Sequence, residues 1–167
     1  IGKFATTSFF PAKPLGCYGD GGAIFLDSDE YLEPLRSLHV HGQGSDKYDN
    51  IRVGINSRLD TIQAAVLLEK LKVFPEEIEK RQVVAKRYND GLGDVAIVPK
   101  VAADCVSTWA QYTIRIPIGQ RDLFMAALKA KGIPTAIYYP KPLHQQTAYR
   151  TYPVAGNGLP VSERVAQ

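Results

Sequence analysis

The feature that most constrains the fold of this chain is a long run of helical spacing between about residues 58 and 90. Apolar residues recur at helical spacing through the first half of the run, at Leu59, Ile62, Ala65, Val66, Leu67 and Leu71. Pro75 lies in its middle and has no amide hydrogen to continue a helix. We therefore expect two helices, the second running from Glu76 to about Asp90. Because the sequence patterns before and after the run differ, we expect these linking helices, residues 61–91, to join two domains.

The flanking sequences have both strand and helix patterns. Residues 22–26 form an apolar run typical of a strand, and the polar residues 27–30 predict a capped helix that continues to about Leu38. After the linking helices, residues 95–98, 110–116 and 133–139 have strand patterns, and residues 121–131 have an amphipathic helical pattern that Gly132 ends. We therefore expect an α/β fold with a small α+β domain over residues 92–167.

Composition excludes several classes of protein. The hydrophobic content of 45% is enough for a packed core, and a net charge of +3 without a basic run does not indicate nucleic-acid binding. No apolar run approaches the length of a membrane span, and we expect no signal peptide. Cys17 and Cys105 do not form a metal or redox motif, which is typical of a cytoplasmic protein. Because the chain does not begin with methionine, we expect a piece of a longer protein.

Lys13 lies in an unusual apolar segment, Ser8-Phe-Phe-Pro-Ala-Lys-Pro-Leu-Gly16. Pro14 favours an extended backbone at Lys13, and the neighbouring side chains are expected to shield its amine from water. Shielding favours the neutral amine, which is the nucleophile that forms Schiff bases with carbonyl groups. The alternative is a lysine whose stem packs on phenylalanine while its amine reaches water. The segment alone leaves both interpretations open.

A glycine-dense turn follows Lys13, with glycines at positions 16, 19, 21 and 22. Glycine allows close backbone approach, so the turn is able to bind an anion. It matches neither the P-loop nor the dinucleotide fingerprint. For the glycines alone, a hairpin turn leading into the strand at residues 22–26 is the better interpretation.

Two further polar segments are candidates for binding. His39 and His41 suggest a metal, but zinc needs at least three protein ligands and the remaining histidine, His144, is distant, so we expect no metal site. Residues 138–146 combine tyrosines, prolines, a lysine and His144 at the end of an expected strand. This composition suits either a wall for a sugar or nucleotide or a proline-rich surface loop.

Four segments together resemble the DegT/StrS-type sugar aminotransferases, which depend on pyridoxal 5′-phosphate (PLP). They are the lysine segment with its glycine turn, Arg-x-x-x-x-His-Gly-Gln at residues 36–43, Val-Gly-Ile-Asn-Ser-Arg-Leu-Asp-Thr-Ile-Gln-Ala-Ala at residues 53–65, and Tyr-Pro-x-Pro-Leu-His at residues 139–144. The resemblance covers nearly the whole chain in order. It is strongest to the branch that aminates UDP-linked 3-keto sugars.

The resemblance implies a type I PLP-dependent aminotransferase fold. Residues 1–60 would be the end of the large PLP-binding domain, residues 61–91 the linking helices, and residues 92–167 a truncated small C-terminal domain. Lys13 matches the lysine that bonds covalently to PLP, and Ser8 matches a hydroxyl that binds the cofactor phosphate. Asn56 matches an asparagine that reaches the phosphate bound by the partner subunit.

The resemblance also implies substrate contacts. Arg58 matches an arginine that contacts substrate from the partner subunit of a homodimer with shared active sites. Tyr138, Tyr139 and His144 match substrate-facing positions. Relatives often carry His-Tyr where this chain has Tyr138-Tyr139, so the first contact departs from the pattern. A related dehydratase branch carries histidine at the lysine position, and Lys13 argues against that reaction.

The implied function is transamination of a nucleotide-linked keto sugar in the cytoplasm, with glutamate as the expected amino donor. The resemblance places it in the biosynthesis of polysaccharide, such as lipopolysaccharide O-antigen. Two alternatives stay open. One is an aminotransferase acting on a 4-keto sugar or a cyclitol ketone, and the other is a non-catalytic module for sugar-nucleotide binding or dimerisation. Because the upstream part of the cofactor site lies outside this chain, the fragment alone is expected to be inactive.

Overall fold

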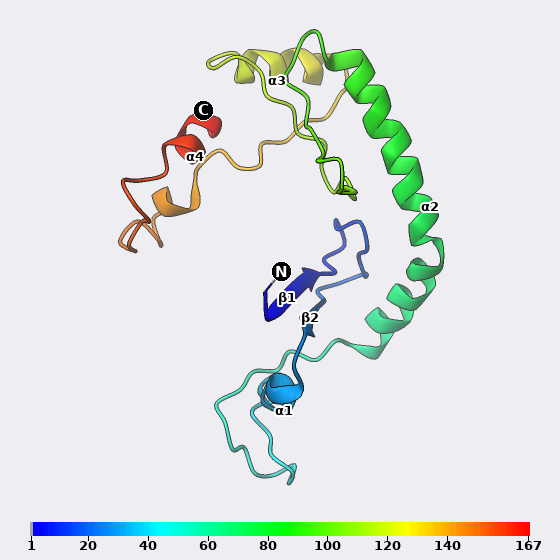
Figure 1. The fold of residues 1–167 in the computed structure, drawn as a ribbon, viewed down its shortest axis with the longest axis vertical. Coiled ribbons are helices and arrows are strands. Elements are labelled where there is room, and N and C mark those ends of the chain that lie inside the picture. Colours follow the sequence, from blue (N-terminus) through cyan, green and yellow to red (C-terminus); the bar gives the residue numbers. More distant parts are fainter. Residues whose placement is uncertain (1) are drawn as a thin grey trace. The chain divides into compact units, whose positions relative to one another are not determined.

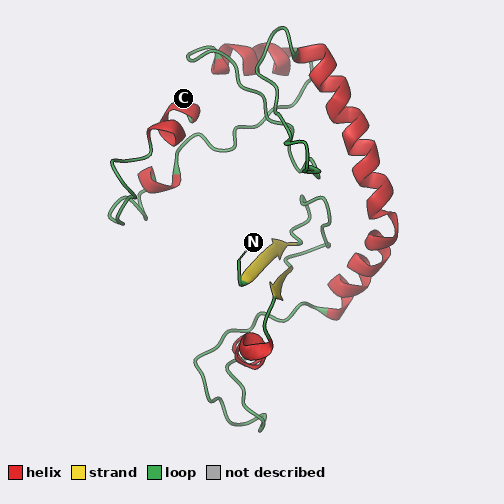
Figure 2. Ribbon diagram, viewed as in Figure 1, coloured by secondary structure: helices red, strands yellow, loops and turns green. Residues whose placement is uncertain are grey.

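The computed structural model describes residues 2–167, which divide into two compact units. Unit 1 contains the chain up to residue 91 together with residues 100–112, and unit 2 contains residues 92–99 and 113–167. Both helices and strands are present (Figures 1 and 2), in agreement with the α/β expectation. The domain boundaries that the resemblance implies, at residues 60 and 91, remain a prediction.

Unit 1 begins with a β-hairpin. Strand β1, Phe4–Ser8, pairs antiparallel with β2, Gly22–Leu26, so that Phe4 lies opposite Leu26 and Ser8 opposite Gly22 (Figure 2). The expected strand at residues 22–26 is confirmed, as is the hairpin interpretation of the glycine turn. Strand β1 was not expected, since its Thr-rich sequence has no apolar alternation. The hairpin makes residues 9–21, with Lys13, the connection between two paired strands.

A short helical segment follows the hairpin, as the sequence predicted. It consists of the 3-10 turn η1, Asp29–Tyr31, and the helix α1, Leu32–Leu38. The Ser28 hydroxyl accepts a hydrogen bond from the Glu30 amide at 3.3 Å, which satisfies one of the free amides at a helix start.

The connection from α1 to the next helix folds back on the end of α1. The amide of Ile55 donates to the Leu38 carbonyl at 2.8 Å, and the amide of His41 donates to the Ile55 carbonyl at 2.9 Å. Gly42 has a φ of +76°, and a Cβ there would fall on the carbonyl oxygen of Arg52. Only glycine permits this close approach, so the connection is fixed at its base.

The dominant element of unit 1 is the helix α2, Thr61–Leu92, which Figure 1 shows as one continuous helix. The predicted break at Pro75 is therefore wrong. A proline inside a helix removes one backbone hydrogen bond and crowds the carbonyl four residues earlier, at a cost of about 3 kcal/mol. The flanking residues, rich in Leu, Glu and Lys, are strong helix formers, so the helix continues through Pro75 at this cost.

Unit 2 contains the helices α3, Arg121–Ala130, and α4, Pro160–Val165, and the 3-10 turn η2, Leu143–Gln145. The predicted helix at residues 121–131 is confirmed, and Gly132 follows it with a φ of +75°. The predicted strands at residues 95–98, 110–116 and 133–139 are wrong. Within the described residues these segments form one isolated bridge, Ile97 with Arg115, because a strand pattern becomes a strand only when a neighbouring strand pairs with it.

Few side chains of the described chain are buried. The buried apolar side chains among residues 2–167 are Cys17, Leu67 and Ala85, all in unit 1. Leu67 and Ala85 lie on α2, and Cys17 lies in the connection that carries Lys13. Within residues 2–167, no helix has the length and apolar character needed to cross a membrane.

Candidate active site

Lys13 projects from the β1–β2 connection, residues 9–21, here called the lysine loop. The loop is closed at its base by the Phe9 amide, which donates to the Gly21 carbonyl at 2.7 Å. Lys13 itself ends a tight turn, in which its amide donates to the Phe10 carbonyl at 2.8 Å. The expected shielding of Lys13 by its own segment is wrong, since the residue is exposed and Phe10 is 50% exposed. Neighbours in a short loop diverge, and shielding would need another element packed over the amine.

Cys17 is the packed centre of the lysine loop. Its side chain is fully buried, and its thiol lies 3.0 Å from the Phe9 carbonyl and 3.1 Å from the Gly19 carbonyl. Its amide donates to the same Phe9 carbonyl at 2.8 Å. A Cβ at Gly21 would lie 2.9 Å from the Cys17 sulfur, so glycine leaves the space that the thiol fills. The sequence assigned Cys17 only to the class of reduced thiols.

Two polar residues of α2 hold the lysine loop. The Gln63 side-chain oxygen accepts a hydrogen bond from the Tyr18 amide at 2.7 Å. The Lys70 ammonium donates to the Gly16 carbonyl at 2.5 Å and lies 5.4 Å from the centre of the Tyr18 ring. Sequence reasoning missed both contacts, because a polar residue on a helix is usually solvated. The only available signal was their spacing of seven, which places both on one helix face.

Ser8 and Lys13 lie on the same hairpin. Ser8 is the last residue of β1, and its hydroxyl oxygen accepts a hydrogen bond from the Phe10 amide at 3.2 Å. A hydroxyl that accepts one hydrogen bond still has its own proton to donate. Ser8 and Lys13 are both exposed. The hairpin therefore presents a hydroxyl donor and a primary amine five residues apart, at the two sides of one turn.

Asn56 and Arg58 lie on the connection before α2. Val40 and Asn56 form an isolated antiparallel bridge, and the Ser57 amide donates to the His39 carbonyl at 3.0 Å. The backbone at this point is therefore fixed, while Asn56 and Arg58 are exposed. An amide and a guanidinium held this way are available to a phosphate or carboxylate from outside the unit.

The three remaining predicted residues line one cavity in unit 2, with a volume of about 550 Å³. Tyr138 and Tyr139 meet edge to face with ring centres 5.4 Å apart. His144 also lines this cavity, as do Tyr149, Tyr152, Leu159 and residues of α4. The structure thus brings Tyr138, Tyr139 and His144 together at one cavity, while their contact with a substrate remains a prediction.

Glu163 fixes the orientation of His144, a contact that the sequence did not reveal. One Glu163 carboxylate oxygen lies 2.9 Å from His144 Nε2, and the His144 side chain is only 16% exposed. A carboxylate only accepts hydrogen bonds, so it holds the histidine proton on Nε2. In neutral histidine the Nδ1 atom then accepts a hydrogen bond.

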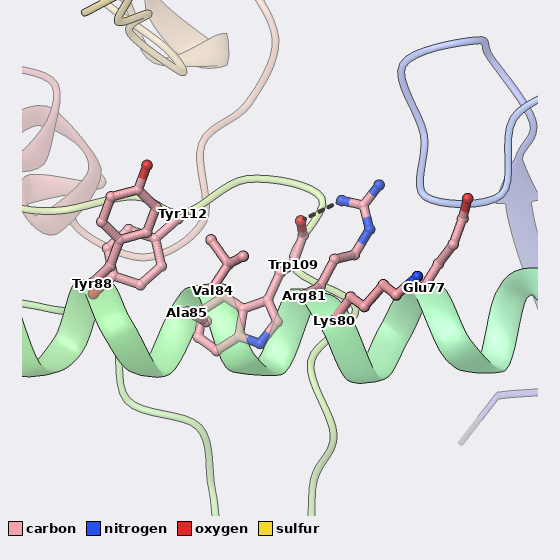
Figure 3. Close-up of a pocket in the computed structure, with 8 residues that line it drawn as sticks. All are labelled: Glu77, Lys80, Arg81, Val84, Ala85, Tyr88, Trp109 and Tyr112. Carbon is pink, nitrogen blue, oxygen red and sulfur yellow. Dashed lines mark hydrogen bonds between the residues drawn. The ribbon is translucent and has the colours of Figure 1, made fainter.

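A second cavity, of about 340 Å³, lies in unit 1 against α2 (Figure 3). Several of its polar groups are already paired. Arg81 donates to the Trp109 carbonyl at 3.0 Å, the dashed line in Figure 3, and the Trp109 ring nitrogen donates to Gln82 at 2.7 Å. Tyr112 donates to Asn89 at 2.6 Å. We interpret this cluster as structural, because its hydrogen bonds join α2 to residues 107–112.

The pKa values of Tyr112, Glu76 and Lys80 are shifted in this region, that of Lys80 upward by its contact with Glu76. Burial raises the pKa of Tyr112, whose ring lies 4.9 Å from that of Tyr88. The Lys80 ammonium, 2.6 Å from Glu76, lowers the pKa of that carboxyl by a hydrogen bond and by its charge. The Glu76–Lys80 pair is fully solvated on the helix surface, where such pairs contribute little to stability.

The histidine pair of residues 39–41 lies in the connection between α1 and α2. His41 has a φ of +59°, and its amide supports the base of the connection. Among residues 2–167, no three His, Cys, Asp or Glu side chains are grouped so that they could hold a metal ion.

The sequence model of the DegT/DnrJ/EryC1/StrS aminotransferase family matches residues 1–167. The chain belongs to this family. The resemblance inferred from the sequence motifs is thereby confirmed. The family is one of PLP-dependent sugar aminotransferases. The individual roles of Lys13, Ser8 and the other predicted site residues remain predictions.

Members of the DegT/DnrJ/EryC1/StrS family resemble the chain along its whole length. UDP-2-acetamido-2-deoxy-3-oxo-D-glucuronate aminotransferase of Pseudomonas aeruginosa is 50% identical over 167 residues, which are 99% of this chain and 45% of that protein. The crystal structure of a family member from Brucella abortus has a TM-score of 0.94 at 57% identity, covering 99% of this chain and 44% of its own. NtdA from Bacillus subtilis, solved with bound cofactor PMP, has a TM-score of 0.84 at 28% identity. The match covers 98% of this chain and 39% of the NtdA chain.

The chain spans less than half the length of these relatives. The matched structures have the same arrangement of elements over the part they share, so the fold assignment to PLP-dependent aminotransferases of this family holds for that part.

Proposed function

We propose that this chain carries the lysine-bearing part of a PLP-dependent enzyme that transfers an amino group to a nucleotide-linked keto sugar. The observation that carries the proposal is the lysine loop. A hairpin closed at its base presents the exposed amine of Lys13 and the free hydroxyl proton of Ser8 on one turn. Family membership supplies the reaction class in which this pair has a use.

The residues present fit PLP. The cofactor has an aldehyde, which a primary amine binds covalently, and a phosphate, which hydroxyl and amide groups bind through hydrogen bonds. Ser8 keeps its own proton for a phosphate oxygen because its oxygen is the acceptor in its contact with Phe10. Asn56 would bind the phosphate held by a partner subunit.

PLP, when bound, supplies an electron sink that makes the bonds at an amino-bearing carbon easier to break. Lys13 Nζ would hold the cofactor and, once an incoming amine displaces it, take up and return a proton. The proton carrier must reach both the carbon that loses the proton and the one that gains it. A long side chain on a closed loop meets this requirement, because the loop fixes its base while its four methylene groups let Nζ move.

For the substrate we propose a UDP-linked 3-keto sugar, with glutamate as the amino donor. The Pseudomonas aeruginosa relative, whose name specifies such a substrate, is 50% identical to the chain. The unit 2 cavity also suits a sugar nucleotide, because it combines the rings of Tyr138 and Tyr139 with a histidine held by Glu163. Arg58 would bind an anionic substrate group from the partner subunit of a homodimer.

The proposal is tested with the intact gene product. Borohydride reduction followed by peptide mass spectrometry should locate PLP on Lys13, and Lys13→Ala should abolish both this adduct and amino transfer. Detection of the adduct on another lysine, or normal turnover in Lys13→Ala, would contradict the proposal. A panel of UDP-linked 3-keto, dTDP-linked 4-keto and cyclitol ketones should give the highest kcat/KM with the first.

A further inference from the structure

Two α2 residues that face the lysine loop have no role in the proposed chemistry. Gln63 and Lys70 lie seven residues apart, which is nearly two helical turns, so both project from one face of α2 about 10 Å apart. Each contacts the loop through its backbone, Gln63 at the Tyr18 amide and Lys70 at the Gly16 carbonyl. Backbone contacts fix the path of the loop irrespective of the side chains it carries.

We propose that Gln63 and Lys70 are positioning residues that hold Lys13 in its working place through the backbone of the lysine loop. The inference rests on the proposed function, since Lys13 must act on PLP for its position to matter to catalysis. It goes beyond that function by assigning the position of Lys13 to α2, a helix that carries none of the proposed catalytic groups.

The contact passes from Lys70 to the Lys13 turn through Gly16. Gly16 is buried and lies so close to the preceding turn that a Cβ there would be 2.7 Å from the Phe10 carbonyl oxygen and 2.8 Å from that of Pro11. The Phe10 carbonyl is also the acceptor for the Lys13 amide, at 2.8 Å. Displacing Gly16 therefore displaces the turn from which Lys13 projects.

Lys70 is suited to this role by its charge and its surroundings. Its ammonium is part-buried, donates to the buried Gly16 and lies over the Tyr18 ring at 5.4 Å. A cation strengthens a hydrogen bond to a carbonyl and is also attracted to the face of an aromatic ring. Lys72 offers a contrast two residues further along, where it pairs with the exposed Glu69 at 2.7 Å and makes no hydrogen bond to the loop.

The test compares Lys70→Met, Lys70→Arg and the matched control Lys72→Met in the intact gene product. Amide hydrogen exchange is measured first, without PLP. Lys70→Met should speed exchange of the Lys13 amide by about tenfold, although Lys70 does not touch that residue, while Lys72→Met should leave it unchanged. Lys70→Arg, which keeps the charge, should restore most of the protection.

Kinetics and the cofactor spectrum supply the second readout. Misplacing Lys13 should lower kcat by about tenfold with little change in KM, because the sugar contacts lie elsewhere. It should also shift the pH at which the visible absorbance of the bound cofactor changes, since that absorbance reports the surroundings of the Lys13 nitrogen. Gln63→Leu should produce the same loss of kcat and the same spectral shift. Gln63→Glu, which keeps the acceptor oxygen, should behave like the wild type.

Unchanged exchange at the Lys13 amide in folded Lys70→Met and Gln63→Leu would overturn the inference, and so would an equal effect of Lys72→Met. Should Lys70→Met fail to fold, the comparison of Gln63→Leu with Gln63→Glu tests the same claim. Absence of a PLP adduct on Lys13 in the wild type would refute the proposed function instead. In that case the exchange result still decides whether α2 holds the loop.

Discussion

At the scale of single residues, the lysine loop depends on its glycines, which have no side chain, as much as on the side chain of Cys17. Gly16 packs directly on the backbone of Phe10 and Pro11, and Gly21 leaves room for the Cys17 thiol. The fully buried thiol then lies within hydrogen-bond distance of the Phe9 and Gly19 carbonyls, so its own polar group is satisfied inside the loop. These contacts fix the backbone of the loop at several points, which suits a nucleophile that must be presented at a fixed place.

Gly16→Ala should destabilise the protein by about 1–3 kcal/mol, because the added methyl group meets backbone atoms on two sides and the loop must move. Gly91→Ala is the matched control. A Cβ at Gly91 meets nothing within 4 Å, and Gly91 lies within α2. Removing a helical glycine should stabilise the protein by about 0.5–1 kcal/mol. Urea denaturation measures the free energy of unfolding of both variants. A change of the same sign in the two variants would contradict the packing argument.

Tyr112 provides a prediction about pH. Its raised pKa means that folding favours the neutral phenol. The stability from this group is therefore fully present below the ordinary tyrosine pKa of about 10 and is lost as the pH rises through the raised value. A difference absorbance titration of the wild type against Tyr112→Phe isolates this phenol from the other tyrosines. Its midpoint should lie above about 10, and an ordinary midpoint would show that the phenol is solvated.

At the scale of elements, α2 organises unit 1. One continuous helix carries Gln63 and Lys70 against the lysine loop near its start and Arg81, Gln82 and Asn89 against residues 107–112 further on. Because a helix is stiff, the two sets of contacts are held in a fixed relation along one axis. A break at Pro75 would have separated them.

Pro75→Ala should strengthen the middle of α2. Alanine restores an amide that can donate to the Leu71 carbonyl and is favoured over proline inside a helix by about 3 kcal/mol. Hydrogen exchange over residues 76–79 should slow as a result. Pro34→Ala is the control, because Pro34 lies in the first turn of α1, where proline is tolerated. Faster exchange in Pro75→Ala would show that the packing of unit 1 depends on the proline.

At the scale of the whole molecule, the described residues expose many large apolar side chains. Val53 is 99% exposed and Phe25 57%, while the buried apolar set is small. Apolar surface of this kind marks places that other protein covers. In the proposed homodimer, part of this cover would come from the partner subunit, which would also receive Asn56 and Arg58 from this one.

Subunit mixing tests the shared sites. Co-expressing the intact gene product as Lys13→Ala with Arg58→Ala should restore about one quarter of wild-type activity. Half of randomly formed dimers are mixed, and each mixed dimer then has one intact site of two if Arg58 acts across the interface. Each variant expressed alone is the control. Activity no higher than the sum of the two separate variants would place Arg58 in the same site as its own Lys13.

The sequence by itself determined several local elements and the family. Strand β2, helices α1 and α3, the Ser28 cap and the Gly132 stop follow from residue patterns over a few positions, because propensity and capping act locally. Four segments together, with the motif around Lys13 among them, identified the family.

Only the tertiary structure decided how these pieces are held. The continuation of α2 through Pro75 and the absence of paired strands in unit 2 depend on what packs or pairs with each segment, which local sequence does not contain. The same holds for the contacts of Gln63 and Lys70 with the lysine loop and of Glu163 with His144. These join residues between 19 and 54 positions apart. Hydrogen bonds over such separations exist only once the chain has folded.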